Sequence, residues 1–348
     1  MRASGDSKRI TIKDIAQAAN VSTATVSRVI NDPDTVSPKR KEQVEKAIAK
    51  FHFTPNALAR ELITQRTRTI GVVIPDISNI FFSMLVKGLH QTLDQRGYSV
   101  LLSDTDSSAE REMSYLTLFM EKRVDAIVVV GTRLQDKAAN DLLTRCSSRV
   151  PVLLVNDSIP GSRLFTINVD EERGAYEAVS YLASLGHEKI GFLNGEGAYS
   201  TYALKQQGYE RALRDHGIVP NKDYLVMVSP YEEGGSTGAR ELLSLANKPT
   251  AIFTASDQIA LGAYRTIQTK GYRIPRDISI MGFSGMAFSS ELYPSLSTVS
   301  QYPKEMGIKA AGMILDIMAG KYGEPQRITL PYELLKRESC APMKPFGK

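Results

Sequence analysis

Cysteine, histidine and long apolar segments are scarce in this chain of 348 residues. Its two cysteines, Cys146 and Cys340, are far apart in the sequence and stand in no metal-ligand spacing. We expect them to be reduced thiols, as in a cytoplasmic protein. The four histidines are scattered and form no ligand motif, so the sequence predicts neither a metal site nor a cofactor.

Segments that could cross or enter a membrane are also missing. No segment approaches the ~20 apolar residues needed to span a bilayer, and Ala126–Val130 has only the length of a strand. The start of the chain is polar and has no apolar segment typical of a secretory signal. The sequence therefore predicts a cytoplasmic protein without a membrane partner.

Motifs of common enzymes do not occur either. Gly195-Glu196-Gly197 follows a predicted strand, but the third glycine and the acidic residue of a dinucleotide-binding motif are missing. We interpret this segment as a turn. A phosphate-binding loop, a nucleophile elbow and a paired Cys–His motif are absent from the sequence, which disfavours an enzyme.

Positive charge is concentrated at the start of the chain. Residues 1–68 contain 13 Lys and Arg against 7 Asp and Glu, whereas the remaining residues contain 30 and 31. A small basic domain joined to a larger, nearly neutral one is typical of a protein that neutralises DNA phosphates at one end.

Residues 11–30 have the pattern of two short helices joined by a tight turn. Apolar residues recur at helical spacing on both helices, namely Ile12, Ile15, Ala16, Ala19, Val26, Val29 and Ile30. Asn20 suits the turn and Ser22 can cap the second helix. The outer face carries Thr23, Ala24, Ser27 and Arg28, which suit a DNA major groove. The alternative is a helical hairpin buried in a core, and the local positive charge favours DNA binding.

Further helices extend this pattern to residue 68. A helix predicted from Ser37 to Lys50 completes an all-α headpiece over residues 1–52. Thr54 can cap a short helix that begins at Pro55. A polar segment without apolar periodicity follows, so residues 53–68 are predicted to be a hinge helix and linker.

From Thr69 onward, strands alternate with helices, which predicts parallel sheets covered on both faces. Lys189–Leu193 repeats the pattern of Thr69–Val73 120 residues later. We therefore expect two doubly wound α/β lobes over residues 69–340, with a ligand cleft at the carboxyl ends of the strands. The expected lobes are residues 69–167 with 298–325, and residues 168–297 with 326–340, before a tail at 341–348.

Several motifs resemble those of the LacI/GalR family of bacterial transcription regulators. They are Val21-Ser22, Thr25–Arg28, Phe53–Arg60, Ile74–Asn79, Ser256–Gly262, Asp277–Phe283 and Leu296–Val299. The resemblance runs from about Ile10 to Cys340. It implies a helix-turn-helix headpiece followed by a periplasmic-binding-protein-like core. It also implies a repressor that binds a pseudo-palindromic operator as a homodimer and responds to a small-molecule effector in the cleft.

The resemblance also implies how double-stranded operator DNA would be read. Arg28 would contact a guanine edge, while Thr23 and Ala24 select other bases. Residues 55–63 would form a hinge helix at the minor groove, where Leu62 wedges into the central base step. The methyl side chain of Ala24 implies an operator with a central CG step. The predicted DNA contacts are Thr11, Ser22, Thr23, Ala24, Thr25, Ser27, Arg28, Asn31, Asn56, Ala59 and Leu62.

For the effector, the resemblance implies contacts from Asn79, Phe81, Phe82, Thr132, Asn156, Lys205, Tyr231, Asp257 and Ser284. The alternative for the two phenylalanines is a place in the hydrophobic core. Two positions depart from the family pattern, because Ser284 replaces an aspartate and Lys205 replaces an arginine. Losing a carboxylate while keeping a cation favours an anionic effector, such as a sugar phosphate, held partly by Lys205.

Two other functions remain as alternatives. The first is control by a protein coeffector, since Asn79–Phe82 resembles catabolite control regulators of the family, although Gly285–Phe288 lacks the arginine that such recognition needs. The second is a solute-binding protein with the same two lobes, which the basic headpiece and the polar start of the chain disfavour.

No heptad-bearing tail follows the last strand, so a dimer is expected rather than a coiled-coil tetramer.

Overall fold

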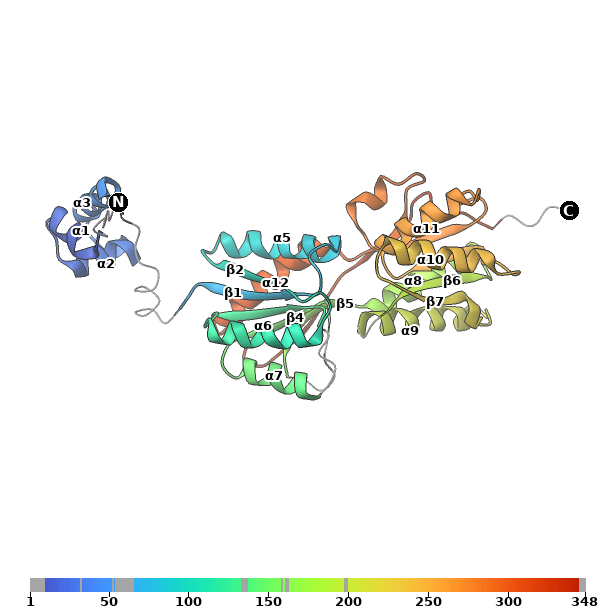
Figure 1. The fold of residues 1–348 in the computed structure, drawn as a ribbon, viewed down its shortest axis with the longest axis horizontal. Helices are drawn as coiled ribbons and strands as arrows, with labels where there is room; N and C mark the ends of the chain where they lie inside the picture. Colours follow the sequence, from blue (N-terminus) through green and yellow to red (C-terminus); the bar gives the residue numbers. More distant parts are fainter. Residues whose placement is uncertain are drawn as a thin grey trace, which may run out of the picture. The chain divides into compact units, whose positions relative to one another are not determined.

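The chain forms two compact units, Met1–Thr67 and Arg68–Lys348, and each has its own hydrophobic core (Figure 1). The computed structural model describes residues 10–31, 33–51, 53, 66–132, 137–157, 159, 163–196 and 200–343. In this part of the chain, no helix combines the length and the apolarity that a membrane crossing requires. The first unit is helical and the second is an α/β core.

The headpiece consists of α1 (Ile12–Ala18), α2 (Thr23–Asn31), the short 3-10 helix η1 (Pro33–Thr35) and α3 (Pro38–Phe51). Its core is formed by one apolar face from each helix, with Ile15, Val26 and Val44 completely buried. Between α1 and α2, Asn20 adopts a positive φ of 52°. The Ser22 Oγ accepts a hydrogen bond from the Thr25 N–H at 3.2 Å. The turn and the helix cap predicted from the sequence are confirmed.

The first lobe of the core is a parallel sheet with the strand order β11-β5-β4-β3-β1-β2. The strands are β1 (Thr69–Ile74), β2 (Ser99–Asp104), β3 (Ala126–Val130), β4 (Val152–Val155), β5 (Phe165–Val169) and β11 (Arg327–Leu330). The helices are α5 (Ile80–Asp94), α6 (Ala109–Glu121), α7 (Lys137–Ser147) and α12 (Pro303–Met318). α5 and α12 cover one face of the sheet, and α6 and α7 cover the other (Figure 1).

The second lobe repeats this plan with the strand order β12-β10-β9-β8-β6-β7. Its strands are β6 (Ile190–Gly195), β7 (Leu225–Val228), β8 (Ala251–Thr254), β9 (Ser279–Ser284), β10 (Ser297–Ser300) and β12 (Glu333–Leu335). Its helices are α8 (Glu171–Ser184), α9 (Ser200–Asp215), α10 (Glu232–Ser244) and α11 (Asp257–Thr269), with the 3-10 helices η2 (Lys222–Tyr224) and η3 (Ala287–Ser290). β12 runs antiparallel to β10, whereas the other pairs in this sheet are parallel.

Burial on both faces explains why central strands such as β1 and β3 are continuous apolar runs. Along β1, the side chains of Ile70, Val72 and Ile74 enter the cluster beneath α5 and α12, while Val73 enters the cluster beneath α6 and α7. Successive side chains of a strand point to opposite faces, so a strand covered on both sides needs apolar residues at every position. The predicted doubly wound architecture is confirmed.

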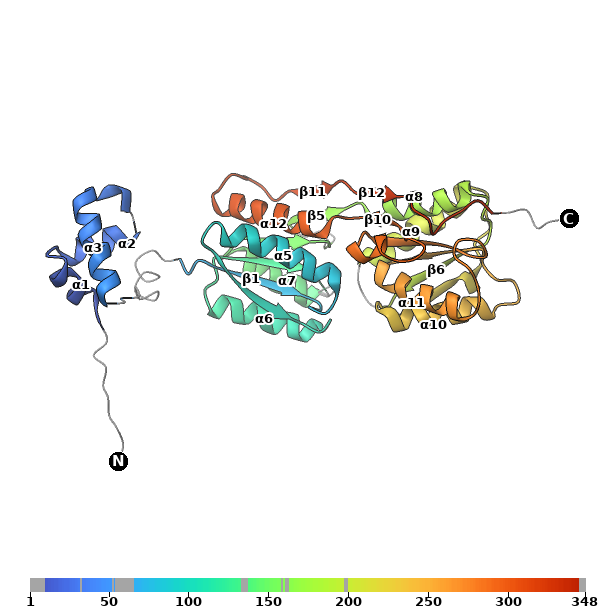
Figure 2. The same ribbon diagram turned by 90° about the horizontal axis from the view of Figure 1, so that it is seen from above.

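The chain passes between the lobes three times, from β5 to α8, from β10 to α12 and from β11 to β12, and Figure 2 shows these strands along one side of the core. The expected lobe boundaries are wrong by one strand at each late crossing. β10 pairs in the second sheet rather than the first, and β11 pairs in the first sheet rather than the second. Local sequence identifies a strand, but the sheet that it joins depends on partners elsewhere in the chain.

Two further segments differ from the sequence expectation. The pattern does not predict β5, because Thr166 and Asn168 interrupt its apolar run, yet β5 pairs with β4 and β11. Residues 341–343 pack on the second lobe instead of starting the tail: the Met343 N–H donates to the Leu185 carbonyl at 2.8 Å. Pro331, which has no N–H, separates β11 from β12.

Close packing of α5 on α12 yields a stability test. A Cβ at Gly88 of α5 would lie 2.0 Å from the Lys304 carbonyl oxygen, so Gly88→Ala must push the two helices apart. We expect urea denaturation to show a loss of about 1–3 kcal/mol in the free energy of unfolding. The matched control is Gly312→Ala on α12, where a Cβ would meet no atom within 4 Å. It should be neutral or stabilising by up to ~1 kcal/mol, and equal effects of the two variants would contradict this packing.

Candidate functional site

The α2 helix presents a polar face outside the headpiece core. Thr23, Ala24 and Arg28 are exposed, whereas Val26 and Val29 on the opposite side are buried. A hydroxyl, a methyl group and a guanidinium side by side on an exposed helix match the groups that read base edges in a major groove. This arrangement is the one expected of a recognition helix.

The remaining predicted DNA contacts fall into two groups. Ser22 is exposed, Thr25 and Ser27 are half-buried, Thr11 caps α1 at an exposed position, and Asn31 is the last residue of α2. Asn56, Ala59 and Leu62, the predicted hinge contacts, lie outside the described residues. Their DNA contacts stay a prediction.

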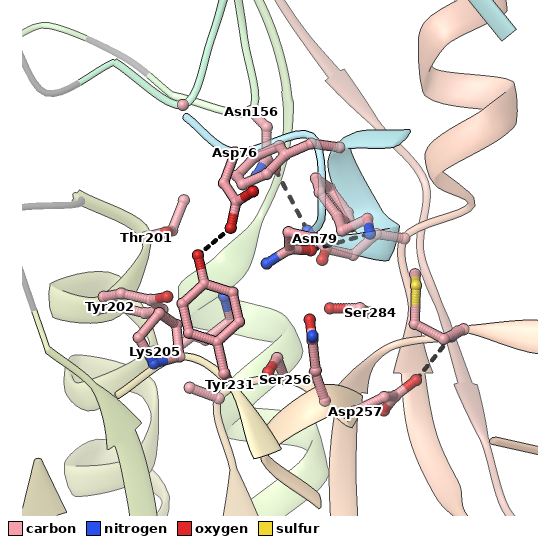
Figure 3. Close-up of a pocket in the computed structure, with 18 of the residues that line it drawn as sticks. Asp76, Asn79, Asn156, Thr201, Tyr202, Lys205, Tyr231, Ser256, Asp257 and Ser284 are labelled. Carbon is pink, nitrogen blue, oxygen red and sulfur yellow. Dashed lines mark hydrogen bonds between the residues drawn. The ribbon is translucent and has the colours of Figure 1, made fainter. Parts of the chain in front are cut away.

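A cleft in the core is lined by residues that follow the carboxyl ends of strands from both sheets. Its lining consists of Asp76, Asn79, Phe81, Phe82, Ser107, Gly131, Asn156, Thr201, Tyr202, Lys205, Pro230, Tyr231, Ala255, Ser256, Asp257, Gln258, Ser284, Met286 and Gln301. Figure 3 shows these side chains converging from first-lobe and second-lobe segments. Eight of the nine predicted effector residues are in this lining.

The ninth, Thr132, is not among the lining residues. Its side chain is buried and its hydroxyl donates a hydrogen bond to Glu112 on α6. The neighbouring Gly131 lines the cleft instead, close to the Phe82 ring. The hydroxyl of Thr132 therefore serves the contact between the end of β3 and α6.

Phe81 and Phe82 combine both roles that the sequence leaves open. Asn79 caps α5 by accepting a hydrogen bond from the Phe81 N–H at 3.0 Å. The two rings then meet edge to face, with their centroids 5.5 Å apart. Phe81 belongs to the first-lobe core and Phe82 is half-buried against it, yet both line the cleft. The cleft wall is therefore rigidly attached to the core.

Among the described residues, side-chain hydrogen bonds join the two lobes at and beside the cleft. The Tyr231 hydroxyl donates to Asp76 Oδ2 (Figure 3), and the Ser200 hydroxyl donates to Asp157 Oδ1. Partial burial alone would raise the pKa of Asp76, but hydrogen bonds from Tyr231 and Ser78 outweigh it and leave that pKa below its ordinary value. Asp76 is therefore a carboxylate that is already engaged by the opposite lobe.

Lys205, predicted to be an available cation, is already paired. Its Nζ lies 2.9 Å from Glu171 Oε2, and the two side chains are only 6% and 2% exposed. The ammonium group also lies 4.4 Å from the centroid of the Phe283 ring. Glu171 at the start of α8 already supplies a counter-charge, so Lys205 is not an unpaired cation, and binding of an anionic ligand stays a prediction.

Asp257 lines the cleft but directs its carboxylate into the protein. It is completely buried and accepts hydrogen bonds from the Met286 N–H at 2.7 Å and from Thr298 Oγ1 at 2.6 Å. Burial raises the pKa of Asp257 to about 7, against the opposing effect of these hydrogen bonds. The carboxylate holds the turn after β9, where Ser284 and Gly285 both have positive φ, 116° and 72°.

Several residues in and behind this cleft were not predicted from the sequence. Asp76 lies within the family motif Ile74–Asn79, and Gln301 lies two residues after the motif Leu296–Val299, so both carried a signal. Glu171 carried none. It follows β5, a strand that the apolar pattern does not reveal, and therefore its place at the end of a strand could not be predicted.

The raised pKa of Asp257 predicts a pH dependence of stability. The folded protein binds this proton more tightly than the unfolded chain, whose aspartate has the ordinary value of 3.8. The stabilisation is complete below ~pH 4 and is lost as the pH rises through about 7. Urea denaturation between about pH 5 and 8 should therefore show the advantage of wild type over Asp257→Asn shrinking as the pH rises. A difference that does not change with pH would contradict the assignment.

Two family models match the chain. Residues 11–56 match the bacterial regulatory proteins of the lacI family, and residues 67–338 match the periplasmic binding proteins and sugar binding domain of the LacI family. The second description covers solute-binding proteins as well, so the headpiece match is what separates this chain from that class.

Curated relatives match over nearly the whole chain. The HTH-type transcriptional repressor CytR of Escherichia coli K12 is 34% identical over 97% of this chain and 98% of its own length. Catabolite control protein A of Priestia megaterium is 32% identical over 95% of this chain and 99% of its own. These relatives are regulators rather than enzymes.

Solved structures agree with the fold. The Lac repressor dimer bound to operator and the anti-inducer ONPF has a TM-score of 0.88 and 29% identity, covering 96% of this chain and 100% of that one. A complex of the transcriptional regulator CelR with cellobiose has a TM-score of 0.72 and 27% identity, covering 95% and 100%. From its headpiece, its two-lobed core and these matches, the chain belongs to the LacI family of bacterial transcription regulators.

Proposed function

We propose that this protein is a repressor that binds a pseudo-palindromic operator as a homodimer and is controlled by a small molecule in the cleft. The observation that carries the proposal is an exposed recognition face on α2 in the same chain as a cleft lined from both lobes. The Lac repressor structure, a dimer on operator DNA with an anti-inducer, supports it. The protein would act in the cytoplasm, on the DNA that it binds.

DNA binding would begin with the headpiece. The exposed side chains of Thr23, Ala24 and Arg28 would meet base edges, and the surplus of basic residues would neutralise phosphates. Residues 55–63 form too short a segment to be helical alone in water. We propose that they become helical on the operator, where Leu62 unstacks the central step and kinks the DNA.

The cleft favours an uncharged, hydroxyl-rich effector such as a sugar or glycoside. Lys205 is neutralised by Glu171, Asp76 is engaged by Tyr231, and Asp257 is engaged by the turn after β9. The rest of the lining offers aromatic rings, amides and hydroxyls, which suit ring faces and hydroxyl groups. An anionic effector is the second candidate, and a ligand screen decides between the two.

Regulation would use the hydrogen bonds that now join the lobes. A ligand whose hydroxyl groups replace the Tyr231–Asp76 contact in the cleft would change the balance between open and closed lobes. A change of lobe closure would alter the spacing of the two hinge segments in a dimer. The effector and the operator would thus be coupled although they bind different parts of the chain.

Operator reading by Arg28 can be tested with one substitution. Operator sequences are first selected from random duplexes, and we expect a two-fold-symmetric consensus with a central CG step. Arg28→Ala should then weaken binding to that duplex by about 1–3 kcal/mol and relax the preference at one base pair of each half-site. Fluorescence anisotropy with single-base variants of the duplex measures both effects.

The control for this variant is Lys46→Ala, which removes the same charge from an exposed position on α3. It should weaken binding slightly and equally for all sequences. A selection without two-fold symmetry would refute dimeric operator binding. Unchanged base preference in Arg28→Ala would show that α2 does not read the DNA at that residue.

The class of effector can be tested by ligand-induced stabilisation of the full chain. A ligand that binds only the folded protein raises Tm. We expect neutral sugars or glycosides in a metabolite screen to raise Tm, and their phosphorylated forms to raise it less or not at all. Tighter calorimetric binding of the phosphates than of the parent sugars would contradict an uncharged effector.

A further inference from the structure

A buried ion pair lies at the floor of the cleft, the part of its lining formed by Lys205. Only one member of this pair can contact a ligand. Lys205 lines the cleft, whereas Glu171 lies behind it, outside the lining. The Nζ–Oε2 distance of 2.9 Å places the two opposite charges in direct contact. Because both side chains are almost completely buried, water screens this attraction far less than it would at the surface.

Glu171 is fixed in place by more than Lys205. It is the first residue of α8, where the positive end of the helix dipole favours a carboxylate. Its Oε1 accepts a hydrogen bond from Gln301 Nε2 at 2.7 Å, and the same amide nitrogen lies 3.4 Å from Asn156 Oδ1. These contacts come from three chain segments, after β4, after β5 and after β10, so Glu171 cannot swing away without disturbing them.

This arrangement has a consequence for the charge of the ligand. An anion that approaches the Lys205 ammonium must also approach the Glu171 carboxylate, which already holds that cation. Binding would then cost the burial of a second negative charge beside the first. A neutral hydroxyl group can accept a hydrogen bond from the ammonium without this penalty.

We propose that Glu171 is a specificity-determining residue, which makes the cleft select uncharged ligands and reject anionic ones. It would act through Lys205, as a positioning residue behind the cleft, and not by touching the ligand. The proposal depends on the proposed function in one respect: it takes the cleft to be the effector site. Removing the Glu171 charge should therefore convert the floor of the cleft into an anion site.

The test uses the full chain, the variant Glu171→Gln and inorganic phosphate as the probe. The variant keeps the size of the side chain and an oxygen for Gln301, but leaves the Lys205 charge without its counter-charge. At constant ionic strength, we expect phosphate to raise the Tm of this variant and to bind it at least about tenfold more tightly than wild type by calorimetry. Adding Lys205→Met to the variant should abolish the gain.

The matched control is Glu172→Gln at the next position. Glu172 pairs with Arg211, and both side chains are partly exposed, 32% and 41%. The control therefore changes the net charge by the same amount without touching the floor of the cleft. Phosphate should bind it no better than wild type.

Three outcomes would overturn the proposal: equal phosphate binding by Glu171→Gln and Glu172→Gln, phosphate binding by wild type as tight as by Glu171→Gln, or a gain that survives Lys205→Met. If Glu171→Gln unfolds without phosphate, the proposal requires added phosphate to restore cooperative unfolding, and a failure to do so also overturns it.

Operator binding by wild type is measured in parallel. Its loss would refute the proposed function while leaving the phosphate result to decide the role of Glu171.

Discussion

The carboxyl ends of parallel strands must lie at one edge of a sheet, and the functional parts of this core depend on that constraint. Each sheet delivers polar residues such as Asn79, Asn156 and Ser284 to its own edge, directly after buried apolar strands. The three passages between the sheets bring the two edges into one unit, so the cleft receives residues from both lobes. Packing of the strands therefore fixes where the residues that can contact a ligand lie.

Within that frame, the charged groups of the cleft are satisfied by the protein itself. Tyr231 reaches Asp76 from the opposite lobe, Glu171 neutralises Lys205, and Asp257 holds the turn after β9. Buried charges need partners, and each of these partners also connects separate chain segments. Of these contacts, Tyr231–Asp76 joins the two lobes, whereas the other two lie within the second lobe. We propose that a ligand that replaces the Tyr231–Asp76 contact changes the balance between open and closed lobes.

Much of this could be predicted from sequence, because it depends on local pattern. The three helices of the headpiece, the Asn20 turn and most strands of the core follow from periodicity and capping, whereas the predicted cleft residues follow from the resemblance to the family. The sheet joined by β10 and β11 could not be predicted, since strand pairing is decided by distant partners. Glu171 was hidden for the same reason: its contact with Lys205 joins α8 to α9 and exists only in the folded protein.

The central claim, that one chain couples operator binding to a ligand in the cleft, is tested most directly by measuring both affinities on the same protein. Thermodynamic linkage requires a ligand that changes operator affinity by some factor to have its own affinity changed by the operator by the same factor. We predict a coupling of roughly 5- to 150-fold, equal in both directions, for a ligand found by thermal shift. A ligand that binds the cleft of the full chain and leaves operator affinity unchanged would contradict the account.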